Sequence, residues 1–152
     1  MGAAAVRVID VESSPEQVWE VLADFASISA WAPNVDHSCL LGADAAGPGA
    51  VRRIQSGSVT LVETVVAWDP PTTLSYDLAG LPPVVESASN TWHVVGLGER
   101  TRVSLTSVVD AGPRPPQQLA ARAVGRVMAR ASDQMLTGLR NRLLAAEQGA
   151  RT

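Results

Sequence analysis

The most informative segment of this chain is residues 117–146, QQLAARAVGRVMARASDQMLTGLRNRLLAA. It contains no proline, and its apolar residues recur at the spacing of one helix face. This face consists of Ala120, Val124, Val127, Met128, Ala131, Met135, Leu139 and Leu143. At about 1.5 Å per residue the helix would cross a whole sheet, and the proline-containing stretch 113–116 predicts a break just before it. We therefore expect one long C-terminal helix, in which Gly125 and Gly138 permit close packing or bending.

The residues before this helix predict a strand, two short helices and then an antiparallel sheet. Residues 6–11 alternate loosely and are rich in Val and Ile, which indicates a strand. Ser14 suits an N-cap, Pro15 suits the first helical position and Gln17 completes a capping box, so a helix is expected to begin there. A second short helix is expected over 24–32, ended by the following proline. Closely spaced turns then separate strands expected at 35–41, 51–55, 58–68, 74–78, 84–95 and 102–109, which favours antiparallel pairing.

This order of elements predicts an α+β fold with about seven strands. A curved antiparallel sheet would wrap around the long C-terminal helix, and the part of its inner face that the helix leaves uncovered would enclose an internal, largely apolar cavity. The chain has 152 residues, of which 46% are hydrophobic and 18% are charged. These values are typical of one globular domain, so we expect a single domain over residues 1–152.

The composition excludes several classes of protein. One cysteine excludes an intramolecular disulfide and a multi-cysteine zinc site, and two histidines leave little material for a transition-metal centre. The net charge of −3 argues against nucleic-acid binding, and no apolar run is long enough for stable membrane insertion. There is no phosphate-binding glycine loop and no signal-peptide pattern. We therefore expect a cytoplasmic, bacterial monomer or homodimer with no metal and no cofactor.

Several short motifs follow one another in a fixed order along the chain. They are SPEQVW (14–19), LADF (22–25), WAP (31–33), GAVR (49–52), Glu63, WD (68–69), LSY (74–76) and TRV (101–103), followed by the long helix. In order and spacing they resemble the SRPBCC superfamily, the START-related helix-grip proteins, in its polyketide cyclase/dehydrase-like branch. The resemblance covers about residues 5–146 and implies the helix-grip fold. It implies no single activity, because the superfamily includes lipid carriers, hormone receptors, cyclases and antitoxin-like proteins.

Arg52 and Glu63 face each other by counting outward from the Ser56-Gly57 turn. Plant hormone receptors, to whose fold this chain is similar, have a comparable Arg and Glu on neighbouring strands inside their cavity. The resemblance implies that Arg52 and Glu63 point inward, bond each other and anchor a carboxylate, hydroxyl or carbonyl of a ligand. The alternative is a structural pair on either face of the sheet.

Period-two alternation extends the inward face along the neighbouring strands. From Glu63 it adds Val65 and Ala67. On a later strand we take Asn90 and Trp92 as inward, whereas the opposite parity would bring the adjacent threonine and histidine inside.

Other elements contribute further candidates for the cavity. Trp31 either lines its entrance or packs the second helix onto the sheet, and Leu81 begins a Leu-Pro-Pro loop that is either a gate or a rigid connection. Met128 and Met135 lie on the helix face, where methionines adapt to varied ligands or simply fill the core. The candidate ligand-binding residues are Trp31, Arg52, Ile54, Leu61, Glu63, Val65, Tyr76, Leu81, Asn90, Trp92, Val124, Met128 and Met135.

Three functions fit these expectations. The first is binding of a small hydrophobic molecule that is lipid-, polyketide- or isoprenoid-like. The second is a polyketide aromatase/cyclase or dehydratase, in which Glu63 is the base, Tyr76 is the acid and Arg52 orients a carbonyl. The third is a protein-interaction role, as in a toxin–antitoxin or stress pair, that uses the arginine row at 122, 126 and 130 as a basic face. That row is otherwise a solvated face or pairs with acidic N-terminal residues, and a filled interior would favour the third function.

Overall fold

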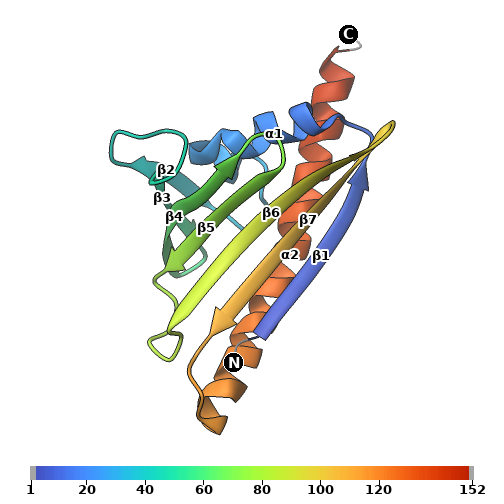
Figure 1. Ribbon diagram of the computed structural model, residues 1–152. Helices are drawn as coiled ribbons and strands as arrows, with labels where there is room; N and C mark the ends of the chain where they lie inside the picture. Colours follow the sequence, from blue (N-terminus) through green and yellow to red (C-terminus); the bar gives the residue numbers. More distant parts are fainter. Residues whose placement is uncertain (1–2, 151–152) are drawn as a thin grey trace.

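The computed structural model describes residues 3–150, in which α2 (Pro115–Ala150) lies along one curved antiparallel sheet (Figure 1). The sheet has seven strands in the order β1-β7-β6-β5-β4-β3-β2. Their bounds are β1 Ala3–Val11, β2 His37–Leu41, β3 Val51–Ser56, β4 Val59–Asp69, β5 Thr73–Ala79, β6 Ser87–Leu97 and β7 Arg100–Asp110. Two short helices, α1 (Pro15–Ala23) and η1 (Phe25–Ala30), connect β1 to β2. The expected α+β helix-grip architecture is confirmed.

The helix ends follow their local sequence signals. The side chain of Ser14 accepts from the backbone N–H of Gln17, and the backbone N–H of Ser14 donates to the side chain of Gln17, so the predicted capping box is formed. The second short helix is a 3-10 helix rather than a continuous segment over 24–32. Helix α2 begins at Pro115, two residues before the predicted start, because proline is tolerated in the first turn of a helix.

Several strand predictions are wrong in detail. Strand β2 begins at His37 instead of residue 35, where the Val35 N–H donates to the Ala32 carbonyl in a turn. The segment 84–86 was expected to open a strand but belongs to a turn, in which the Val85 N–H donates to the Pro82 carbonyl. A β-bulge shifts the β4–β5 register between Val65 and Ala67. Beyond the bulge, Trp68 pairs with Leu74 and packs on the core, so Ala67 does not continue the inward face.

Helix α2 is held against the sheet and the preceding loop by close contacts. A Cβ at Gly138 would overlap the carbonyl oxygen of Trp31, so this glycine allows the helix to approach the end of η1 directly. Farther toward the start of the helix, the buried hydroxyls of Ser132 and Ser107 lie 3.2 Å apart and link α2 to β7. None of the described helices is both long and apolar enough to cross a membrane.

The apolar core has two parts. The larger cluster joins α1, η1, the sheet and the later part of α2, and it includes Trp19, Phe25, Trp92 and Leu139. The smaller cluster consists of Ala88, Val109, Ala111, Ala121 and Met128 and lies at the first part of α2.

Candidate ligand-binding cavity

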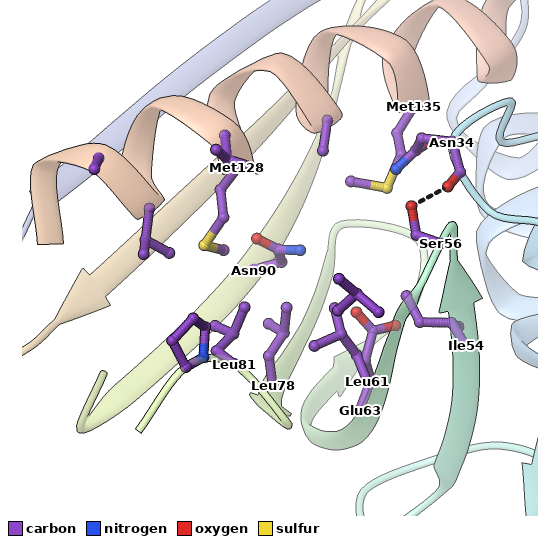
Figure 2. Close-up of a pocket in the computed structure, with 16 residues that line it drawn as sticks. Asn34, Ile54, Ser56, Leu61, Glu63, Leu78, Leu81, Asn90, Met128 and Met135 are labelled. Atoms are coloured by element: carbon purple, nitrogen blue, oxygen red, sulfur yellow. Dashed lines mark hydrogen bonds between the residues drawn. The ribbon is translucent and has the colours of Figure 1, made fainter. Parts of the chain in front are cut away.

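A cavity of about 390 Å³ lies between the sheet and the first half of α2 (Figure 2). Its wall contains twelve apolar and four polar residues. They are Asn34, Ile54, Ser56, Val59, Leu61, Glu63, Leu78, Leu81, Pro82, Asn90, Ala123, Val124, Val127, Met128, Ala131 and Met135. Val59 and Val127 line the cavity although they are 45% and 69% exposed, so it opens to solvent at this edge.

Arg52 and Glu63 form a buried ion pair between β3 and β4. The two residues are direct partners in the strand register, as expected. The turn itself lies at residues 57–58 instead of at Ser56-Gly57, because Ser56 still pairs with Val59. Arg52 Nε donates to Glu63 Oε1 over 2.6 Å, and both residues are only 2% exposed. A second guanidinium nitrogen donates to the carbonyl oxygen of Phe25 over 2.9 Å. Taking two charges out of water costs free energy, so this pair requires the additional hydrogen bond and the close geometry seen here.

The guanidinium group of Arg52 is enclosed by aromatic rings. Its central carbon lies 3.8 Å from the ring centroid of Phe25 and 4.7 Å from that of Tyr76. These cation–π contacts occupy the faces of the guanidinium group. Arg52 consequently lies behind the wall, whereas its partner Glu63 is part of the wall.

Tyr76 lies behind the wall as well. Its hydroxyl accepts from Trp92 Nε1 over 3.2 Å, and its side chain is fully buried. Burial raises the pKa of the Tyr76 phenol above its ordinary value, and the negative charge of Glu63 raises it further. The charge of Arg52 and the hydrogen bonds from Trp92 and Asn90 oppose this shift without reversing it. Tyr76 is therefore a neutral hydrogen-bonding group at physiological pH.

The cavity wall includes eight of the residues predicted to bind ligand. They are Ile54, Leu61, Glu63, Leu81, Asn90, Val124, Met128 and Met135. The inward parity of Asn90 and Trp92 is confirmed, since both are buried while the intervening residue is more exposed.

The other five predicted residues do not border the cavity. They are Trp31, Arg52, Val65, Tyr76 and Trp92. Arg52 is buried, and the other four belong to the larger core cluster or pack against it. Trp31 packs edge-on against Trp92 with ring centroids 6.0 Å apart, which matches the packing alternative for this residue.

Sequence reasoning did not include eight wall residues among the candidates. They are Asn34, Ser56, Val59, Leu78, Pro82, Ala123, Val127 and Ala131. Leu78 could have been identified from its period-two alternation with Tyr76. Val127 and Ala131 could have been identified from the helix periodicity. Val127 had been assigned to the packed helix face, but it is exposed at the opening of the cavity. Asn34 lies in a loop without periodicity, where it is held by the Ser56 hydroxyl, which donates to its carbonyl oxygen (Figure 2).

Charged side chains also lie outside the cavity, within residues 3–150. Within residues 3–150, no group of three or more His, Cys, Asp or Glu side chains could hold a metal ion. Arg122, Arg126 and Arg130 are exposed and make no ion pair with a described residue. The arginine row is thus a solvated face. Asp10 on β1 pairs with Arg102 instead, with Arg102 Nε 2.9 Å from Asp10 Oδ1.

Comparison with known proteins places the chain in a family. Residues 3–144 match the family described as polyketide cyclase / dehydrase and lipid transport. The chain belongs to this family. A comparison with curated proteins found no significant match.

Several solved structures of other proteins share the fold. The Zhui aromatase/cyclase from Streptomyces sp. R1128 is 21% identical, with 94% of each chain covered and a TM-score of 0.78. A START superfamily protein from Mycobacterium smegmatis is 14% identical, with 94% of this chain and 98% of that chain covered and a TM-score of 0.75. A protein from Thermobifida fusca is 27% identical, with 92% of each chain covered and a TM-score of 0.76. These likenesses show the START-related helix-grip fold.

Proposed function

We propose that this protein binds a small hydrophobic molecule in the cavity between its sheet and α2. The observation that carries the proposal is the cavity itself, about 390 Å³ in volume with twelve apolar residues among the sixteen of its wall. Ligand pockets commonly span roughly 300–1,000 Å³, so this one suits a compact ligand. Burial of apolar surface, at about 25 cal/mol per Å², would supply most of the affinity. A lipid-, polyketide- or isoprenoid-like molecule fits this wall and the family description.

Catalysis as a polyketide aromatase/cyclase or dehydratase is the second candidate. It is supported by Glu63, a carboxylate on the cavity wall. A general acid must reach the reacting group within hydrogen-bond distance or through one water. Tyr76 and Arg52 both lie behind the wall, so the proposed acid and the orienting cation do not face the substrate space. The geometry therefore favours binding over turnover, and the open cavity argues against a purely protein-interaction role.

A fluorescence titration with the neutral apolar probe N-phenyl-1-naphthylamine tests the binding proposal. Ala131→Trp places a large ring on the cavity wall, and Ala145→Trp makes the same change at an exposed position of α2. We expect saturable binding to the wild type and to Ala145→Trp, and binding weakened about tenfold or more in Ala131→Trp. Equal binding by both variants would place the probe elsewhere and contradict the proposal.

Native mass spectrometry of the protein purified from its own host can then identify the ligand. A stoichiometric apolar molecule that is released on denaturation would support the proposal and name its chemistry. If that molecule is returned chemically changed after incubation, the cyclase or dehydratase candidate would replace simple binding.

A further inference from the structure

The ion pair between Arg52 and Glu63 presents its negatively charged member, Glu63, to the cavity. The guanidinium group of Arg52 donates to Glu63 Oε1 over 2.6 Å and to the carbonyl oxygen of Phe25 over 2.9 Å. It also makes cation–π contacts with the rings of Phe25 and Tyr76. Arg52 is absent from the wall, whereas Glu63 is present. A ligand inside the cavity therefore contacts the carboxylate of Glu63, whereas the positive charge of Arg52 is not on the cavity wall.

The carboxylate of Glu63 offers hydrogen-bond acceptors to a ligand in the cavity. A carboxylate has two oxygens and about four acceptor sites, and among the described residues Glu63 receives one side-chain hydrogen bond, on Oε1. The side-chain oxygen of Asn34, another wall residue, is buried and has no hydrogen-bond partner. Figure 2 shows both residues toward the Met135 end of the cavity, with Leu81 at the other end. No described residue of the wall is cationic.

We propose that this cavity selects neutral ligands that direct a hydroxyl group at Glu63, and that it rejects ligands carrying a carboxylate. This inference rests on the proposed function, because it concerns the ligand of the same cavity. A ligand hydroxyl can donate a charge-assisted hydrogen bond to the carboxylate of Glu63. A ligand carboxylate has no proton to donate and would lie beside a like charge on a largely apolar wall. The sequence-based expectation was that Arg52 and Glu63 anchor a carboxylate, hydroxyl or carbonyl of the ligand. The proposal narrows this group to the hydroxyl of an alcohol or phenol, which donates to Glu63.

Three probes that differ in a single substituent test the selectivity. They are 2-naphthol, 2-naphthoate and naphthalene, measured at neutral pH by isothermal titration calorimetry or by quenching of tryptophan fluorescence. We expect 2-naphthol to bind more tightly than naphthalene, and about tenfold or more tightly than 2-naphthoate. Binding of 2-naphthoate as tight as that of 2-naphthol would overturn this inference and leave the proposed function standing. Failure of all three probes to bind would overturn both.

Two variants assign the selectivity to Glu63. Glu63→Gln keeps an acceptor but adds an amide donor and removes the charge, whereas Glu12→Gln makes the same change at an exposed position outside the cavity wall. We expect the ratio between 2-naphthol and 2-naphthoate to fall to about threefold or less in Glu63→Gln and to stay unchanged in Glu12→Gln. An unchanged ratio in folded Glu63→Gln would overturn the assignment. The comparison of probes on the wild type stands even if Glu63→Gln fails to fold.

Discussion

Replacing Arg52 by methionine would leave the carboxylate of Glu63 buried without its counter-charge. The substitution also removes the donor to the Phe25 carbonyl oxygen and the cation–π contacts with Phe25 and Tyr76. Breaking one partner of a buried ion pair typically costs about 3–5 kcal/mol. We expect the free energy of unfolding to fall by about this amount, which is a large part of the roughly 5–15 kcal/mol that stabilises a typical domain.

The double variant Arg52→Met with Glu63→Leu distinguishes the free-energy cost of the unpaired charge from the cost of the lost packing. Both ionic groups are then gone, and the remaining cost is the unpaired carbonyl oxygen of Phe25, about 1–3 kcal/mol. The double variant should therefore be more stable than Arg52→Met alone. Arg53→Met is the matched control, because Arg53 is the exposed neighbour on the same strand and should change stability little.

Urea denaturation followed by tryptophan fluorescence measures all four proteins. A loss below about 1 kcal/mol in Arg52→Met, or a double variant less stable than the single one, would refute the reasoning from the buried pair.

The remaining predictions concern a tyrosine, a glycine and a surface ion pair. Burial raises the pKa of Tyr76, the single tyrosine, so the ultraviolet band of tyrosinate should stay absent above pH about 10 while the protein is folded. The free energy of unfolding should fall as pH rises above about 10, because the tyrosine of the unfolded chain ionises first. Gly138→Ala, whose methyl group meets a backbone oxygen, should lower the thermal midpoint through a loss of about 2 kcal/mol or more, whereas Gly149→Ala on the same helix meets no atom within 4 Å and should change it little. The hydrogen bond from Arg102 lowers the pKa of Asp10, so its stabilising contribution is present above pH about 4 and is lost as pH falls through the folded pKa. The stability difference between wild type and Asp10→Asn should therefore shrink on acidification, and a constant difference would contradict this.

The order of elements and one cross-strand pair were predictable because they depend on local spacing. The two-residue turn after Ser56 and the alternation of β3 and β4 place Arg52 opposite Glu63 wherever the rest of the chain lies. Helix periodicity likewise brought Val124, Met128 and Met135 to one side of α2.

The direction of Arg52 could not be predicted, because it depends on contacts distant in sequence. Phe25 comes from η1 and Tyr76 from β5, and together they hold the guanidinium group away from the cavity. The bulge after Val65 has no turn residue to announce it, and Asn34 reaches the wall only through its loop. The composition of the wall is therefore a tertiary property, whereas the strands that carry it are local.

Because the apolar core has two parts of different size, the two halves of α2 differ in how many buried apolar neighbours they contact. Its later half packs in the large cluster through residues such as Leu136 and Leu139, whereas its first half packs in the small one through Ala121, Met128 and the partly buried Val124. Regions with less buried apolar surface open locally at lower free energy, so backbone amides in the first half should exchange with deuterium faster than those in the second. That half also supplies most of the α2 residues that line the cavity, so local fraying of this segment would widen the opening beside Val127 while the rest of the domain stays folded.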